Sequence, residues 1–201
     1  MDTQFDSRLN RVRYIIHPGE FHATSDPVII STVLGSCVAV VLYDEVNKIG
    51  GMNHFLLPGS VDRAHLYSTS EGRYGIFAME LLINQMIKIG ANRSNLQAKV
   101  FGGGHMFVYK ENEGSSHKIS ENNAEFAFNY LQTENIPLVA HDVGGTHARK
   151  VLFLPDTFQV FQKTIRRSDE AAKIKKEENT FLTNVRKKSI KEKPTGNVEL
   201  F

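Results

Sequence analysis

The sequence predicts an α+β fold built from short strands joined in hairpins and a few helices. Short runs rich in β-branched residues are separated by turn residues, which is typical of strands. Two longer segments repeat apolar residues with a helical period. Strands and helices follow in mixed order, which disfavours a doubly wound parallel sheet. With 201 residues, 41% of them hydrophobic, the chain can form one domain with a sizeable core.

The first strands are predicted over residues 27–33, 38–43 and 52–57. The turn residues of 44–47 separate the second from the third, and Pro58-Gly59 ends the third. This order predicts a β-hairpin that carries Cys37 outward on one strand and His54 back on the next. The two side chains are therefore expected to lie closer in space than their separation in sequence indicates.

The helices are predicted over residues 73–89 and 120–132. Apolar residues of the first segment fall on one face, and Gly90 stands where a C-terminal cap belongs. The second segment is apolar on one face as well and stops before Pro137. Further strands are expected at 99–101, 138–143 and 150–162, the last interrupted by the turn at Pro155-Asp156.

Charge divides the chain into a body, residues 1–165, and a tail, residues 166–201. Of 24 basic and 22 acidic residues, ten basic and six acidic lie from Arg166 onward, so the tail carries +4 and the body −2. The composition of the tail is typical of a mobile helix or a disordered segment. Its terminal Leu200-Phe201 pair is typical of a docking contact. A body without a basic face gives no reason to expect nucleic-acid binding.

The chain is expected to be a cytoplasmic protein that is not embedded in a membrane. It has no apolar run long enough for a signal peptide or a membrane span. Its single cysteine cannot form an intrachain disulfide, so no oxidising compartment is implied.

Cys37 is either a small buried hydrophobic residue or a nucleophile. A thiol attacks carbonyl carbon only as a thiolate, which a neighbouring imidazole can generate. His54, returned by the hairpin, is the candidate base, although a histidine in an apolar strand is more often a structural residue when it stands alone. Taken together, the two residues favour an acyl-transfer site.

A third group would orient the imidazole of His54, and the candidates are Ser31 and Thr32. Ser31 lies six residues before Cys37, so in a continuous strand both side chains would point to the same face, whereas Thr32 would point to the other. Either hydroxyl could instead bond only to nearby backbone. Backbone N–H groups of Ser36 and Cys37 are predicted to form the oxyanion site.

Two glycine-rich stretches are candidate substrate-binding positions. Gly102, Gly103, Gly144 and Gly145 could allow a protein substrate to approach the backbone closely, or could simply form turns that need positive φ. A metal hydrolase is disfavoured, because His105, His141 and His147 are irregularly spaced and no HExxH motif occurs. No cofactor and no metal are expected.

Four stretches resemble the CheD-type chemoreceptor glutamine deamidases of bacterial chemotaxis. They are TVLGSCVAVVLYD, GGMNHFLLPG, FGGGHMF and DVGGTHARKVLFLP, within a likeness that runs over residues 14–163. The resemblance implies a compact α/β/β sandwich of mixed sheets with flanking helices, to which this chain adds its charged tail.

The resemblance also implies a function, hydrolysis of glutamine side chains of methyl-accepting chemotaxis receptors to glutamate with release of ammonia. It makes Cys37 the nucleophile, His54 the base, and Ser31 the counterpart of the family's threonine. The sequence departs from the family at His105 and at Thr157-Phe158, where the family often has Thr-Gly. An alternative is a non-enzymatic adaptor that binds chemoreceptors or a CheC-type phosphatase.

Overall fold

The structure, a computed structural model, describes residues 1–57, 70–105, 113–165 and 168–191. Ten strands, three α-helices and a short 3-10 helix follow one another in these parts of the chain. In order they are β1 (Asp2–Asp6), β2 (Arg11–Ile15), β3 (Phe21–Thr24), β4 (Ile29–Leu34), β5 (Val38–Asp44), β6 (Ile49–Asn53), α1 (Ser70–Lys88), η2 (Arg93–Asn95), β7 (Leu96–Gly102), α2 (Glu113–Thr133), β8 (Leu138–Val143), β9 (Ala148–Leu154), β10 (Gln159–Ile165) and α3 (Ser168–Lys191).

The strands form two mixed five-stranded sheets. The β4 sheet has the order β1-β2-β4-β9-β10, and the β5 sheet has the order β3-β6-β5-β7-β8. The β2–β4 and β7–β8 pairs are parallel and the other pairs are antiparallel. The predicted α+β class with mixed sheets is confirmed.

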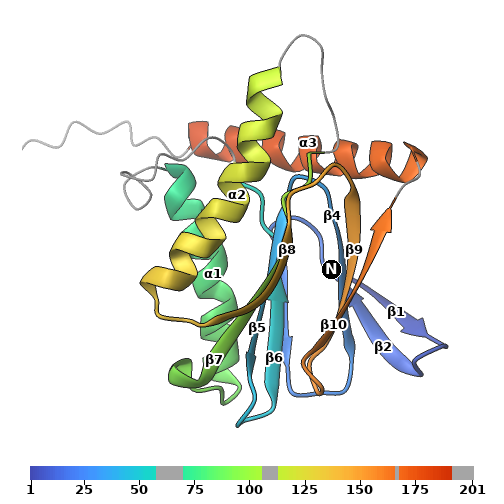
Figure 1. Cartoon of the computed structure of the whole chain (residues 1–201), viewed down its shortest axis with the longest axis vertical. Helices are drawn as coiled ribbons and strands as arrows, with labels where there is room; N and C mark the ends of the chain where they lie inside the picture. Colours follow the sequence, from blue (N-terminus) through green and yellow to red (C-terminus); the bar gives the residue numbers. More distant parts are fainter. Residues whose placement is uncertain (58–69, 106–112, 166–167, 192–201) are drawn as a thin grey trace, which may run out of the picture.

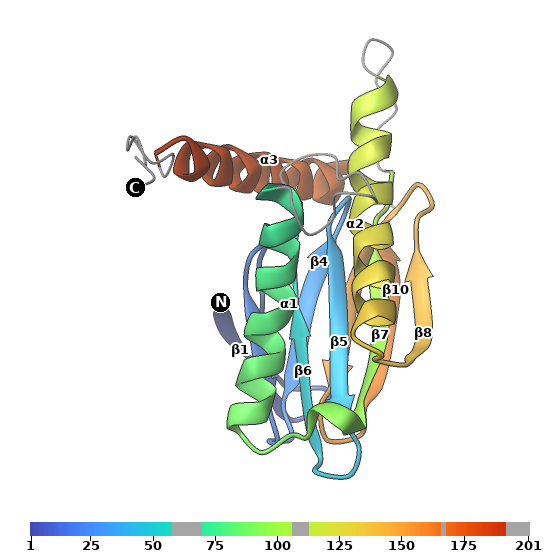
Figure 2. The ribbon, with the colours of Figure 1, turned by 90° about the vertical axis from the view of Figure 1, so that its left-hand side faces the viewer.

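Helices α1 and α2 cover the outer face of the β5 sheet, and the β4 sheet packs on its inner face (Figures 1 and 2). Alternation along β5 produces the two cores, because Val38, Val40 and Leu42 face the helices whereas Ala39 and Val41 face the β4 sheet. The three layers are therefore helix, sheet and sheet, as the resemblance implies.

The predicted hairpin of β5 and β6 is confirmed, with Val41 opposite Met52 and Asp44 opposite Ile49. The second strand begins three residues earlier than predicted and ends at Asn53, so His54 directly follows it. Helix α1 ends as expected, since Gly90 adopts a φ of 111° and Ala91 N donates to Met86 O at 3.0 Å.

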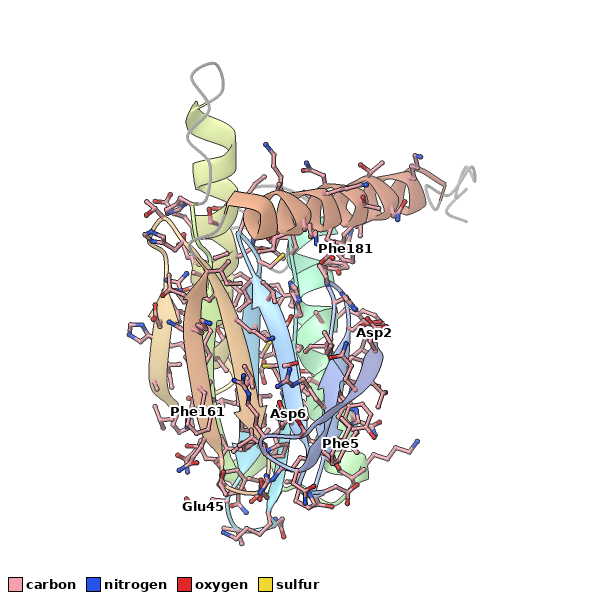
Figure 3. All side chains as sticks on the ribbon, turned by 90° about the vertical axis from the view of Figure 1, so that its right-hand side faces the viewer. Asp2, Phe5, Asp6, Glu45, Phe161 and Phe181 are labelled. Carbon is pink, nitrogen blue, oxygen red and sulfur yellow. The ribbon has the colours of Figure 1, made fainter. Side chains whose placement is uncertain are left out.

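The tail contains a long helix, α3, which lies across the end of the sandwich where β4 ends (Figure 1). Four side chains at helical spacing face the body, namely Ile174, Glu178, Phe181 and Leu182. Figure 3 shows Phe181 on the side of α3 that faces the strands. The terminal Leu200-Phe201 pair and Pro58-Gly59 lie outside the described residues.

The departure from the family at Thr157-Phe158 has a local explanation. Phe158 adopts a φ of 59°, a conformation that glycine takes without strain. Its ring stacks on Tyr43 with the centroids 4.9 Å apart, and the Lys48 ammonium lies over it. These contacts offset the backbone strain that a non-glycine residue brings to this turn.

None of the helices in the described residues is long and apolar enough to span a membrane.

Candidate functional site

The loop of Gly35, Ser36 and Cys37 carries the chain from β4 in one sheet to β5 in the other. Three hydrogen bonds fix its backbone. Gly103 N donates to Cys37 O at 2.7 Å, Gly104 N donates to Gly35 O at 2.7 Å, and the side chain of Asn123 donates to Ser36 O at 2.9 Å. Because a trans peptide directs its carbonyl and its N–H to opposite sides, the bond from Asn123 turns Cys37 N–H to the side of the loop away from α2.

His54 lies on the same face of the β5 sheet as Cys37. Val38 and Phe55 form an antiparallel bridge with hydrogen bonds of 3.0 and 2.9 Å in both directions. Cys37 and His54 each precede one member of this pair, so they are diagonal neighbours on the face opposite to Val38 and Phe55. Diagonal neighbours are about 7–8 Å apart, within reach of an imidazole ring. The structure therefore places these two residues on one face as diagonal neighbours, as the predicted hairpin requires.

The hydrogen bonds of Thr32 determine which nitrogen of His54 carries the proton. Thr32 Oγ1 lies 2.7 Å from Ile16 O and 2.7 Å from His54 Nδ1. The carbonyl of Ile16 can only accept, so the single hydroxyl proton goes to it, and Thr32 Oγ1 must accept from His54 Nδ1–H. His54 Nε2 then has a lone pair, and this buried atom has no hydrogen-bond partner among the described residues. Nε2 is thus available to take a proton.

The hydroxyl that bonds His54 belongs to Thr32 and not to Ser31, the position that the resemblance implies. Ser31 Oγ is 3.5 Å from Tyr14 O, on the other face of β4. The parity argument fails because the chain bends at Gly35 and Ser36 and changes sheets before it reaches Cys37. Thr32 shares the interior face of β4 with Ile30 and Leu34 and reaches His54 across the space between the sheets.

Burial keeps both reactive groups uncharged in this structure. Cys37 has 0% of its surface exposed and His54 3%. Burial lowers the pKa of His54 to about 3, and the backbone carbonyl of Ile16 opposes this effect. Burial also raises the pKa of the Cys37 thiol, and the neighbouring carboxylate of Glu178 adds to this effect. The site therefore holds a neutral imidazole and a protonated thiol while it is covered.

Glu178 of α3 is the residue that covers the nucleophile loop. Its Oε2 accepts from Ser36 Oγ at 2.7 Å and its Oε1 accepts from Cys37 N at 3.2 Å. Next to it, the ring of Phe181 lies 6.3 Å from that of Tyr74 in an edge arrangement. Cys37 N–H thus points at a carboxylate contributed by the chain's own tail.

The four glycines of the glycine-rich stretches have different surroundings. Gly102 and Gly103 are buried behind the nucleophile loop, where Gly103 N donates to Cys37 O and a Cβ on Gly102 would overlap that oxygen. Both have positive φ, as do Gly144 and Gly145, although Gly102 is the last residue of β7 and not part of a turn. Gly144 is half-buried and Gly145 is exposed, and a role for any of the four in substrate binding stays a prediction.

Two residues of the site were not predicted from the sequence. Asn123 joins the loop to the segment after His54, since its Oδ1 accepts from Leu57 N at 2.8 Å while its Nδ2 donates to Ser36 O. It is fully buried in α2, and a lone asparagine in a helix carries no pattern. Glu178 did carry a signal, because it stands between Ile174 and Phe181 on the apolar face of α3.

The depressed pKa of His54 predicts a loss of stability in weak acid. The unfolded chain binds a proton near pH 6.5, whereas the folded chain does not bind it until about pH 3. The free energy of unfolding therefore has its full value above pH 6.5. Below pH 6.5 it decreases by up to about 1.4 kcal/mol per pH unit. Urea unfolding followed by circular dichroism at pH 7 and pH 5 measures this slope.

The matched variant for this measurement is His54→Gln, which should have a shallower slope between pH 6.5 and 5. Burial lowers the pKa of His22 as well, so His22 contributes to the slope of both proteins and cancels in the comparison. Equal slopes in the two proteins would show that His54 accepts its proton in the folded state.

The fold and the site together define an α/β/β sandwich protein with a cysteine and a histidine on one face of a sheet, between its two sheets. Comparison with known proteins identifies its family. The model of the family described as CheD chemotactic sensory transduction matches residues 56–164. The chain belongs to the CheD family.

Curated relatives match over almost the whole chain. A probable chemoreceptor glutamine deamidase CheD 1 of Shewanella oneidensis is 46% identical over 199 residues, which cover 98% of this chain and 91% of that protein. A probable chemoreceptor glutamine deamidase CheD of Thiobacillus denitrificans is 40% identical over 201 residues, which cover 100% of this chain and 93% of that protein. These alignments include the positions of Cys37 and His54, which precede the segment matched by the family model.

Among solved structures, the hypothetical protein YfiH of Bacillus licheniformis superposes with a TM-score of 0.39 and 17% sequence identity. The superposition covers 63% of this chain and 51% of the YfiH chain. This overlap is too partial to define a shared fold.

Proposed function

We propose that this chain hydrolyses glutamine side chains of methyl-accepting chemotaxis receptors to glutamate, with Cys37 as nucleophile and His54 as base. The observation that supports it most strongly is the state of His54. Its Nδ1–H is donated to Thr32, and its Nε2 lies unpaired on the face of the sheet that carries Cys37. A neutral imidazole with a free Nε2 is the form that removes a proton from a thiol.

In the proposed reaction, His54 Nε2 takes the thiol proton and the Cys37 sulfur attacks Cδ of the glutamine. The C–N bond breaks as the imidazolium returns its proton to the departing ammonia, which leaves a thioester. A water molecule, deprotonated by His54, then attacks the thioester and releases glutamate and the thiol. No cofactor or metal is required by this sequence of steps.

Both tetrahedral intermediates carry an oxyanion, and Cys37 N–H is the donor best placed to bind it. The hydrogen bonds from Asn123 to Ser36 O and from Gly103 to Cys37 O hold the peptide units on both sides of the sulfur. A preorganised donor of this kind is worth about 3 kcal/mol of the activation free energy. A loop that is fixed from two elements does not have to reorganise during the reaction.

The function is tested by incubating the full chain with the cytoplasmic domain of a methyl-accepting chemotaxis receptor. Mass spectrometry of receptor peptides should show conversion of selected glutamines to glutamates, and ammonia should appear in equal amount. The control is the same incubation without the enzyme. If the chain binds the receptor domain or a CheC-type phosphatase while no receptor glutamine is converted, the non-enzymatic adaptor is the better account.

Thr32 is proposed as the positioning residue of the site. Thr32→Val keeps the shape of the side chain and removes the acceptor for His54 Nδ1–H, so the neutral imidazole no longer has a fixed tautomer. We expect kcat to fall about 100-fold, in the range that a positioned general base contributes, while KM stays near its original value.

The matched control for Thr32→Val is Ser31→Ala, which removes the neighbouring hydroxyl on the other face of β4 and should leave kcat close to wild type. Steady-state kinetics on the receptor domain measures both variants. If Ser31→Ala and not Thr32→Val lowers kcat, the third role returns to Ser31.

A further inference from the structure

Glu178 is an acidic residue in the apolar face of α3. Ile174 lies four positions before it, and Phe181 and Leu182 lie three and four positions after it. All three pack against the body. Glu177, its neighbour in sequence, is exposed on the outer face. With 8% of its surface exposed, Glu178 is therefore held inside the contact between α3 and the nucleophile loop.

Burying a carboxylate costs free energy unless its oxygens receive hydrogen bonds. The donors here are the Ser36 hydroxyl, 2.7 Å from Oε2, and the Cys37 backbone N–H, 3.2 Å from Oε1. Both are neutral donors of the loop that carries the nucleophile. A carboxylate placed in this way identifies a preformed subsite for a side-chain carboxyl or carboxamide group beside the sulfur.

The group in this subsite has the chemistry of the proposed product, since deamidation of a glutamine leaves a glutamate side chain. The Glu178 carboxylate also accepts the hydrogen bond of Cys37 N–H, the donor that the oxyanion would need. We propose that Ser36 Oγ and Cys37 N–H bind the glutamyl side chain of the substrate, and that α3 inserts Glu178 there as a product-like competitor. This inference rests on the proposed function and adds to it the subsite and its intramolecular inhibitor.

The covered state cannot turn over a receptor glutamine. Cys37 has 0% of its surface exposed beneath α3, so a receptor glutamine reaches the sulfur only after Glu178 has left. The apparent rate is then reduced by the fraction of molecules in which α3 is displaced. Helix α3 is joined to the body through β10 and packs by one face only, which allows it to move without unfolding of the sheets.

The first test compares Glu178→Ala with Glu177→Ala in the full chain. Both remove one negative charge from α3 and introduce a good helix former, but only the first empties the subsite. We expect Glu178→Ala to deamidate the receptor domain roughly tenfold to a hundredfold faster, the gain expected from losing hydrogen bonds to a charged group. Glu177→Ala should match wild type.

The same variants can be compared without a receptor by alkylating the thiol with iodoacetamide. Cys37 is the only cysteine in the chain, so whole-protein mass reports its modification directly. Alkylation should be faster in Glu178→Ala than in wild type and Glu177→Ala. Equal rates in all three would mean that Glu178 does not control access to the sulfur and would overturn the proposal.

The second test uses Glu178→Gln, which puts a carboxamide of nearly the same shape into the subsite. The Cys37 sulfur should form a bond to Cδ of the introduced glutamine while the C–N bond breaks and ammonia leaves with the proton from His54. Water then cleaves the thioester, which restores the thiol and leaves glutamate at position 178. Peptide mass spectrometry should find this conversion in the single variant and not in the double variant with Cys37→Ala.

The outcomes separate this inference from the function on which it rests. If wild type deamidates the receptor and Glu178→Ala is no faster, the inhibitory role of α3 is wrong while the proposed function stands. If no variant converts a receptor glutamine, the proposed function fails. If the glutamine of Glu178→Gln stays unconverted in a protein active on the receptor, Glu178 does not mark the glutamyl subsite.

Discussion

Replacing Cys37 by alanine should abolish glutamine deamidation while the domain stays folded. The sulfur makes the bond to carbon in the proposed reaction, and removing a nucleophile lowers kcat by ~10⁴-fold or more. Ser36 and its hydroxyl, the proposed donor to the substrate side chain, stay in place in this variant, so receptor binding should persist. The measurement is the rate of conversion of receptor glutamines by mass spectrometry, set beside binding of the same receptor domain.

The stability of this variant should change little. Cys37 lies in the core between the sheets, and alanine removes only its sulfur, at a cost below about 2 kcal/mol. A domain with an unfolding free energy of about 5–15 kcal/mol tolerates that loss. Cys37→Ser serves as the control, because it replaces the thiol by a hydroxyl of similar shape. Undiminished deamidation by either variant would remove Cys37 from the mechanism.

Gly102→Ala should damage both the fold and the reaction. Gly102 adopts a φ of 114°, and a Cβ at this position would overlap the carbonyl oxygen of Cys37. The strained backbone and the overlap together should cost about 3 kcal/mol or more. The loop would relieve the overlap by shifting the Cys37 peptide, and a displacement of about 1 Å at a reacting group costs ~100-fold in rate.

Gly144→Ala is the matched control for this prediction. Gly144 also has a positive φ, 79°, but a Cβ there would meet no atom within 4 Å. It should therefore lose only about 1 kcal/mol of unfolding free energy and leave the Cys37 peptide in its place. Urea unfolding and deamidation kinetics measure both variants. If the two glycines respond alike, the close packing of Gly102 against the nucleophile loop has no role in the site.

The hairpin of β5 and β6 and the shared face of Cys37 and His54 were predictable because they depend on local patterns. β-branched residues, a turn and a second apolar run fix which strand follows which, and alternation fixes which side chains share a face. The identity of the third group was not predictable in this way. Thr32 comes from the other sheet, and its distance from His54 depends on how the two sheets pack.

The ends of the chain were harder to predict than its centre. Strand β1 is mostly exposed and polar, so it lacks the apolar alternation that marks a half-buried strand. The charges of α3 were read as a sign of mobility, although Ile174, Phe181 and Leu182 repeat at helical spacing within them. Sequence alone could identify that apolar stripe, but only the three-dimensional contacts place Glu178 on the loop of Cys37.

The central claim is that deamidation proceeds through a thioester on Cys37, and trapping that thioester with hydroxylamine tests it most directly. Hydroxylamine competes with water for the thioester, so receptor peptides should contain glutamyl hydroxamate at the converted positions, in proportion to the hydroxylamine added. The Cys37→Ala variant should give none. Glutamate that forms at an unchanged rate with no hydroxamate at any hydroxylamine concentration would show that water attacks the amide directly, and would contradict the account.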